Sequence, residues 1–156
     1  MTDKADTAQV RIRPPIALAL AIAAALGLDF IWPLPFLPAG FPRAWAGGVV
    51  IAGALALFIW AVVTMIRAGS NVPTNMPALK IVDSGPYGLT RNPIYQAMTW
   101  LILGLAFALD TAWLLVAWIV FGILMHFAVV VHEEAYLERK FGDEYRAYRS
   151  RVRRWL

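Results

Sequence analysis

The 156-residue sequence contains no cysteine. Disulfide bonds, cysteine-based metal sites and a cysteine nucleophile are therefore excluded. Charge is also scarce, because only 15% of the residues are Asp, Glu, Lys or Arg, whereas an ordinary soluble domain carries about 25%. The sequence also lacks a glycine-rich dinucleotide fingerprint, a P-loop and an H-E-x-x-H zinc motif. A soluble Rossmann nucleotide site is thereby excluded.

Hydrophobic residues make up 60% of the chain and are concentrated in four runs. The runs cover residues 16–31, 44–66, 94–109 and 112–131. A membrane-spanning helix needs roughly 20 mostly apolar residues. The second and fourth runs satisfy this requirement, whereas the first and third need flanking residues to reach both interfaces. We therefore expect an all-α polytopic membrane protein with four transmembrane helices and cytosolic amphipathic helices at its C-terminus.

The positive residues predict the orientation in the membrane. Lys4, Arg11 and Arg13 precede the first run, several cations lie in residues 67–92, and seven follow the fourth run. Excess Lys and Arg mark the cytoplasmic side, so we expect both termini and the second loop in the cytoplasm. The net charge of +4 is then a topology signal, and we expect no nucleic-acid binding. The N-terminus is polar for too long to be a cleaved signal peptide, so the first helix is expected to be retained.

The chain divides into an anchor, residues 1–66, and a more informative half, residues 67–156. Gly47, Gly48 and Gly53 in the second run are expected to allow close helix packing. The loop 67–92 is interrupted by prolines, so a continuous helix is not expected there, and residues 78–82 could form a short extended piece.

The connection between the third and fourth runs is so short that these helices are expected to form an antiparallel hairpin. Beyond it we predict a helix over about residues 132–140, continuous with the fourth run and stopped at Gly142. A second helix, over 144–153, would be capped by Asp143. Its apolar face is expected to lie on an anionic leaflet.

The segment GPYGLTRNPIYQ, residues 85–96, is the first candidate for chemistry. Asn92 and Pro93 are typical of an N-cap and a first helical position. The free N–H groups of that turn and the Arg91 cation can attract an anion. Tyr87 and Tyr95 add flat apolar surface with a hydroxyl group. An ordinary transition from loop to helix with interfacial aromatics is the alternative.

The second candidate is the triplet His132, Glu133 and Glu134 at the end of the fourth run. A helix C-terminus prefers cations, so the dipole does not explain these carboxylates. Adjacent helical residues point about 100° apart, and we expect at most one carboxylate to face a given pocket, the other pairing with Arg139 or Arg91. A salt-bridged collar is the alternative.

His126 lies deeper, within the fourth run. An ionisable group inside a span is a functional candidate, and a neutral histidine hydrogen-bonded to a neighbouring helix is the alternative. His126 and His132 project about 120° apart on a helix. We therefore predict no metal site.

Together the two motifs resemble those of the integral-membrane methyltransferases related to isoprenylcysteine carboxyl methyltransferase and the phospholipid methyltransferases. That family's pattern is G-P-Y, R-[HN]-P-x-Y, a helical hairpin, and E-E-x-x-L-x-x-x-F-G-x-x-Y-x-x-Y, and it covers about residues 81–155 here. The residue after Arg91 is His in the isoprenylcysteine enzymes and often Asn in bacterial relatives. Asn92 therefore favours a small bacterial-type member, in an inner membrane, over a prenyl-protein enzyme.

The resemblance implies that S-adenosylmethionine binds on the cytosolic side. By resemblance Arg91, Glu133 and Glu134 are the catalytic candidates. The implied cofactor-binding residues are Tyr87, Arg91, Pro93, Tyr95, His132, Glu133, Leu137, Tyr145 and Tyr148. Chemically, Arg91 suits the cofactor's carboxylate and Glu133 or Glu134 its ammonium or ribose hydroxyls, while the tyrosines, Leu137 or Phe141 suit adenine.

The sequence thus predicts an S-adenosylmethionine-dependent methyltransferase acting on a lipophilic or membrane-embedded acceptor. An isoprenylcysteine-type carboxylate, a phospholipid amine and similar acceptors all fit, and for an amine Glu133, Glu134 or His126 would be the proton acceptor. The alternatives are an NADPH-dependent enzyme similar to the membrane sterol reductases, or a non-catalytic membrane scaffold. The sequence decides neither the acceptor nor the oligomeric state.

Overall fold

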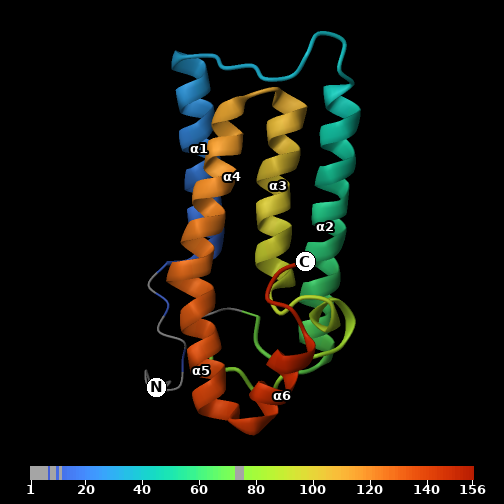
Figure 1. Cartoon of the computed structure of the whole chain (residues 1–156), viewed down its shortest axis with the longest axis vertical. Coiled ribbons are helices and arrows are strands. Elements are labelled where there is room, and N and C mark those ends of the chain that lie inside the picture. Colours follow the sequence, from blue (N-terminus) through green and yellow to red (C-terminus); the bar gives the residue numbers. More distant parts are fainter. Residues whose placement is uncertain (1–6, 8–9, 11, 73–75) are drawn as a thin grey trace.

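The computed structural model describes residues 7, 10, 12–72 and 76–156. Every regular element in this part of the chain is helical, which confirms the all-α class. In chain order the elements are α1 (Pro14–Ile31), α2 (Arg43–Arg67), the 3-10 turn η2 (Gly85–Gly88), α3 (Pro93–Leu109), α4 (Ala112–Met125), the π-helical turn η3 (His126–Val130), α5 (Val131–Phe141) and α6 (Asp143–Arg151) (Figure 1).

Three helices are long and apolar enough to cross a membrane. They are α1, α2 and the continuous helix Ala112–Phe141, which comprises α4, η3 and α5. The helix predicted from the third run, α3, is present but has only 17 residues, because Pro93 begins it and Asp110 ends it in a left-handed conformation. Three candidate membrane spans are therefore found among the described residues, and a fourth span, formed by α3, stays a prediction.

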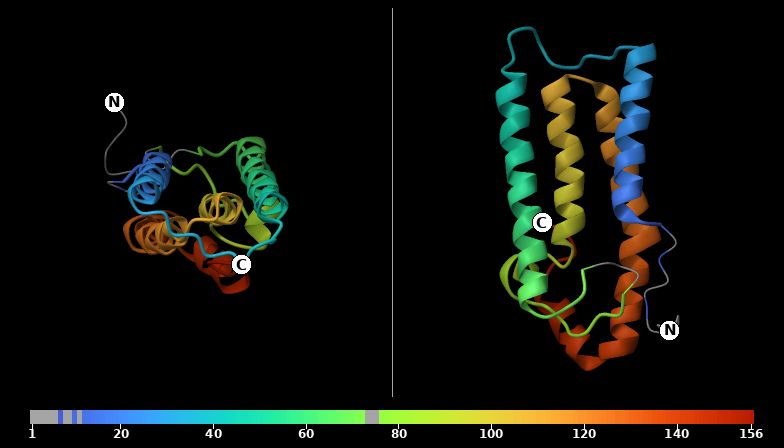
Figure 2. Two further views of the ribbon diagram at one scale, coloured as in Figure 1. Left: turned by 90° about the horizontal axis from the view of Figure 1, so that it is seen from above. Right: turned by 180° about the vertical axis from the view of Figure 1, so that it is seen from behind.

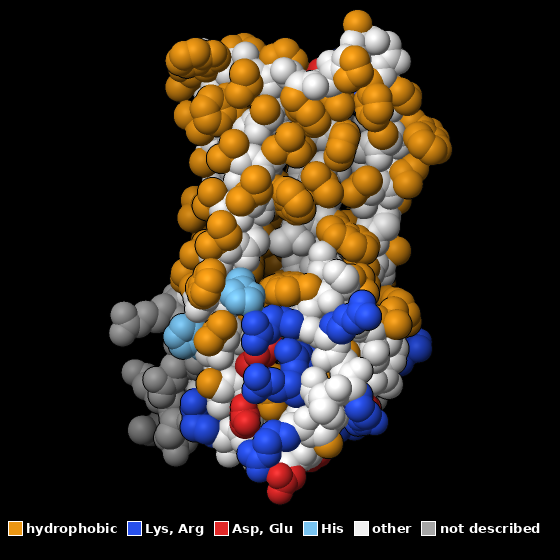
Figure 3. Space-filling model, viewed as in Figure 1, with side chains coloured by type: hydrophobic (Ala, Val, Ile, Leu, Met, Phe, Trp, Pro, Cys, Tyr) orange, Lys and Arg blue, Asp and Glu red, His pale blue; other side chains and the backbone are white. Residues whose placement is uncertain are grey.

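The helices α1 to α4 run side by side as a bundle, with α3 between α2 and α4 and α1 against α4 (Figures 1 and 2). Apolar side chains cover the upper part of the bundle, and Lys and Arg gather at its lower end (Figure 3). This separation suits a protein whose lower end meets an aqueous interface. The orientation in the membrane stays a prediction, and Lys4 and Arg11, on which it partly depends, lie outside the described residues.

Close packing of α2 on α3 depends on two glycines. A Cβ atom added to Gly47 would lie 2.5 Å from the backbone nitrogen of Ala108, and one added to Gly104 would lie 2.7 Å from Cγ1 of Ile51. The expectation of close packing is therefore confirmed for Gly47. It was wrong for Gly48 and Gly53, which have nothing within 4 Å of an added Cβ, because they lie on the other faces of α2.

The upper end of the bundle is held by Asp110, between α3 and α4. Its φ of 53° is left-handed, and its carboxylate accepts the backbone N–H groups of Phe36 and Leu37 at 3.0 and 2.9 Å. These two donors are the main reason that the pKa of Asp110 is lowered. The tight turn confirms the α3–α4 hairpin and ties it to the connection between α1 and α2.

The C-terminal helices follow the prediction in outline. The helix after α4 is continuous with it, as expected, but it passes through the π-helical turn η3, which the apolar pattern does not reveal. Gly142, with φ of 53°, ends α5 as predicted. Asp143 is the first residue of α6 rather than its cap, and its carboxylate binds Arg146 at 2.6 Å.

The apolar face of α6 is covered by the protein itself. Tyr145, Tyr148 and Val152 are buried and pack with Ile81, Leu137 and Phe141. This corrects the expectation that the face lies on a membrane, because it has no area left to offer to lipid. Trp155 follows the helix and contacts His126 instead.

The two neighbouring glycines of α2 provide a test of the helix packing. We expect Gly47→Ala to destabilise the protein by about 1 to 3 kcal/mol, because the added methyl group overlaps Ala108. Gly48→Ala should be neutral or stabilising by up to about 1 kcal/mol, since alanine favours a helix and the site is open. Thermal unfolding of both variants in one detergent measures the difference. Equal melting temperatures would contradict this account of the α2–α3 contact.

Candidate functional site

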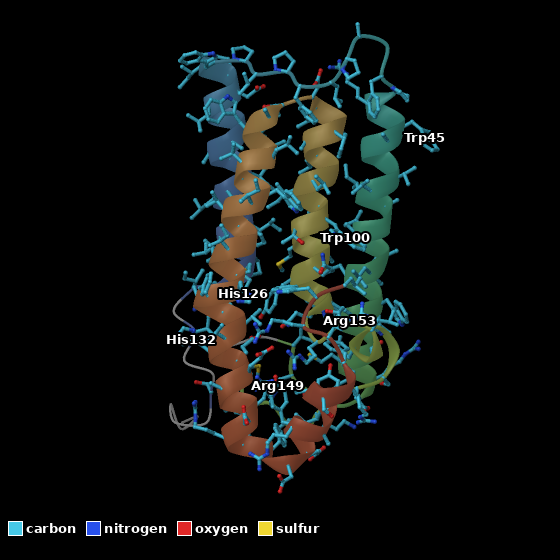
Figure 4. All side chains as sticks on the ribbon, viewed as in Figure 1. Trp45, Trp100, His126, His132, Arg149 and Arg153 are labelled. Carbon is cyan, nitrogen blue, oxygen red and sulfur yellow. The ribbon has the colours of Figure 1, made fainter. Side chains whose placement is uncertain are left out.

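The two sequence motifs meet at the lower end of α3, around a cavity. A space of about 930 Å³, a volume that includes open solvent, lies between the lower ends of α2 and α3, helices α5 and α6, and the loop after α2. All the predicted site residues line it except His132: these are Tyr87, Arg91, Pro93, Tyr95, Glu133, Glu134, Leu137, Tyr145 and Tyr148. His132 is exposed on the outer edge of the molecule (Figure 4). The structure does not bring it to the cavity.

The first motif is fastened to the end of the chain. The N–H of Arg91 donates to the carbonyl of Arg153 at 2.8 Å. The hydroxyl of Thr90 and the amide of Asn92 donate to the carbonyl of Arg154 at 2.9 and 3.1 Å. Asn92 does occupy the N-cap position and Pro93 the first turn, but the Asn92 side chain makes no capping bond; its amide nitrogen donates to the Arg154 carbonyl instead.

The tyrosines of both motifs form one wall. The buried hydroxyl of Tyr148 donates to the carbonyl of Tyr87 at 2.8 Å, which holds η2 against α6. Tyr145 lies beside Tyr148 in an edge-to-face arrangement. Burial is the main cause that raises the pKa of Tyr87 and Tyr148, and it raises that of Tyr145 to about 12. All three therefore stay neutral phenols at physiological pH.

Glu134 is the carboxylate that is neutralised. Arg91 contacts its Oε1 at 3.0 Å, and Arg154 binds both of its oxygens, at 2.9 and 2.6 Å. The side chains of Arg91 and Glu134 are only 8% and 10% exposed. Of the two partners considered from the sequence, Arg91 is the one found, and Arg139 is exposed.

Glu133 is in a different electrostatic position. It accepts a hydrogen bond from the Tyr95 hydroxyl at 2.8 Å. In the part of the chain that the structure describes, no Lys, Arg or His pairs with it. Both carboxylates line the cavity, so the expectation that at most one faces a given pocket was wrong. The cavity extends around α5 far enough to reach residues that point about 100° apart.

Arg91 has unused donor capacity. Its NH1 is 3.4 Å from the Arg149 carbonyl and its NH2 binds Glu134, but its buried Nε has no hydrogen-bond partner in the part of the chain that the structure describes. A buried polar atom of this kind usually has a partner. The cavity is therefore lined by an arginine whose guanidinium is incompletely bonded and by Glu133, a carboxylate that no cation of the described residues pairs with. This pair of charges suits a zwitterionic ligand.

Two residues of the site were missed by sequence reasoning. The Tyr136 hydroxyl accepts the Ala78 N–H at 3.1 Å and thereby holds the loop after α2 over the cavity. Its position three residues after Glu133, on the same helix face, was an available signal. Arg154 was counted only among the tail cations, and no local pattern reveals its contact with Glu134. Residues 78–82 form no strand, but several of them line the cavity.

His126 lies outside the cavity lining. Its Nδ1 accepts the indole N–H of Trp155 at 3.3 Å. His126 therefore has a hydrogen-bond partner, as in the alternative of a structural histidine. The partner comes from the C-terminal segment rather than from a neighbouring helix.

Comparison with known proteins identifies one family. The family model described as phospholipid methyltransferase matches residues 42–144. An uncharacterized protein of Haemophilus influenzae is 53% identical over 45 residues, which cover 29% of this chain and 68% of that protein. No solved structure matches the chain significantly. The family match includes Arg91 and both carboxylates, whereas residues 145–156 lie beyond it.

The wall of the cavity provides a second test of structure. We expect Tyr148→Phe to lower stability by about 1 kcal/mol, because the Tyr87 carbonyl loses its donor. Tyr145→Phe is the matched control, since no hydrogen bond of the Tyr145 hydroxyl is found among the described residues. Chemical unfolding of the two variants provides the comparison. A Tyr145→Phe effect as large as that of Tyr148→Phe would contradict a specific role for the bond to Tyr87.

Proposed function

The chain belongs to the phospholipid methyltransferase family, and we propose that it transfers a methyl group from S-adenosylmethionine to a lipophilic or membrane-embedded acceptor. One observation carries the choice of cofactor. An incompletely bonded guanidinium, Arg91, and a carboxylate that no cation of the described residues pairs with, Glu133, line the same cavity beside a wall of tyrosines. Beyond its methyl group, S-adenosylmethionine has a carboxylate, an ammonium, a sulfonium and an adenosine, for which these groups are suitable partners.

The proposed contacts follow from charge and shape. Arg91 takes the carboxylate, because its buried Nε has no acceptor and a guanidinium binds carboxylates with directed hydrogen bonds. Glu133 takes the ammonium or the ribose hydroxyls. Tyr145, Tyr148 and Leu137 form an apolar slot suited to adenine. Aromatic faces nearby also favour a sulfonium, since they attract cations.

The residues of the chain then act by binding and orientation. The cofactor supplies an electrophilic methyl group, and transfer requires the acceptor atom aligned about 3 to 3.5 Å from it. A carboxylate or thiolate acceptor needs no strong base. If the acceptor is an amine, it must lose a proton, and Glu133 is the proposed proton acceptor. Glu134 is less suited to this role, because its carboxylate oxygens are already bound by two arginines.

We also propose that α3 is a fourth membrane span and that the cavity faces the cytoplasm of a bacterial cell. The lower end of the bundle, where the cavity lies, carries the basic side chains (Figure 3). Cytoplasmic loops and termini are enriched in such residues. The cofactor then enters from water, whereas a lipid acceptor reaches the site from the bilayer.

The function is tested by binding and by product. We expect the purified protein to bind S-adenosylmethionine and not NADPH, and to transfer a labelled methyl group into a membrane lipid extract. Mass spectrometry of the labelled lipid then identifies the acceptor and the methylated atom. Binding of NADPH alone would favour the reductase alternative, and a protein that binds neither would favour the scaffold.

Substitutions at the two charges test the proposed pocket. We expect Arg91→Ala and Glu133→Ala each to weaken S-adenosylmethionine binding at least tenfold, because each removes a charge that the ligand needs; tenfold corresponds to about 1.4 kcal/mol. Arg139→Ala, an exposed change on the same helix as Glu133, should alter the dissociation constant less than twofold. Calorimetric titration in one detergent measures all three. Wild-type affinity in both pocket variants would refute the pocket.

A further inference from the structure

Arg154 shares one carboxylate with Arg91, although it is absent from the cavity lining. Glu134 Oε1 lies 3.0 Å from NH2 of Arg91 and 2.9 Å from Nε of Arg154, and its Oε2 lies 2.6 Å from NH2 of Arg154. Among the described residues the Arg91 guanidinium makes one other hydrogen bond, at 3.4 Å to the Arg149 carbonyl. The orientation of Arg91 therefore depends mainly on Glu134.

The charge count depends on Arg154. Arg91 and Glu134 alone would form a neutral pair, in which the carboxylate compensates the charge of the Arg91 guanidinium. With Arg154 on the same carboxylate, the three groups carry one net positive charge. Because Glu134 is shared, Arg91, which lines the cavity and whose buried Nε has no partner among the described residues, keeps its attraction for an anion.

We propose that Arg154 is a positioning residue of the cofactor site, which fixes Glu134 by its two-point ion pair and thereby holds Arg91 in place as a cation available to the ligand's carboxylate. This inference rests on the proposed function, since it requires S-adenosylmethionine to bind at Arg91. Arg154 itself touches no ligand in this account. It lies beyond the region that the family model matches.

The side chain of Arg154 can be removed without removing the backbone contacts. The bonds from Thr90 and Asn92 go to its carbonyl oxygen, which alanine also provides. Its neighbour Arg153 is a matched control. Arg153 also accepts a backbone bond through its carbonyl, but its side chain is exposed and makes no ion pair among the described residues.

The test compares dissociation constants for S-adenosylmethionine in detergent, well below the melting temperature of each variant. We expect Arg154→Ala to raise the dissociation constant at least tenfold. Arg154→Lys should raise it three- to tenfold, because lysine keeps the charge but not the two-point geometry. Arg153→Ala should change it less than twofold. If Arg154→Ala does not fold, Arg154→Lys decides the matter.

A double-mutant cycle separates positioning from a general structural role. If Arg154 acts through Glu134, then adding Arg154→Ala to Glu134→Gln should change the constant less than threefold. If Arg154→Ala weakened S-adenosylmethionine binding by the same factor with and without Glu134→Gln, the inference would be overturned. Wild-type affinity in Arg154→Ala or Arg154→Lys would also overturn it. Failure of the wild-type protein to bind S-adenosylmethionine would instead overturn the proposed function, so the two failures are distinguishable.

Discussion

The site depends on one buried ion cluster, in which Glu134 holds Arg91 and Arg154. The three residues come from α5, from the segment before α3 and from the end of the chain. Burying an uncompensated charge is costly, and breaking a buried pair by removing one partner typically costs about 3 to 5 kcal/mol. The cluster therefore requires these three segments to stay together. The backbone bonds from Thr90, Arg91 and Asn92 to the last residues reinforce the same junction.

The cluster also determines what the rest of the cavity can do. Glu134 is bound by two cations. Among the described residues no cation pairs with the neighbouring Glu133, which accepts a hydrogen bond from Tyr95. Two adjacent glutamates thus have different properties for a purely geometric reason. Within the proposed function, Glu133 would bind a cationic group of the ligand. Glu134 would orient Arg91, which binds the ligand's carboxylate.

Much of the site could be predicted because its residues are close in sequence and belong to a recognisable pattern. Arg91, Tyr95 and Glu133 were all singled out, and all line the cavity. His132 was included because it adjoins Glu133, but a helix turns its neighbours to different faces, and His132 lies outside. Asn92 occupies the N-cap position of α3 as expected, but its side chain makes no capping bond, and its amide nitrogen donates to the carbonyl of Arg154 instead. Local rules identify a side chain's capability but not the competing partner that it meets.

The sequence by itself determined the helical class, the hairpin and the approximate ends of the helices, because these follow from the apolar runs, from the short connection between the third and fourth runs, and from Pro93 and Gly142. Only the tertiary structure decided which carboxylate is neutralised, and that the apolar face of α6 packs inward on Leu137 and Ile81 rather than toward lipid. The reason is physical. Helix formation depends on neighbours a few residues away, whereas the pairing of Arg154 with Glu134 depends on how α5, α6 and the final residues turn back toward α3.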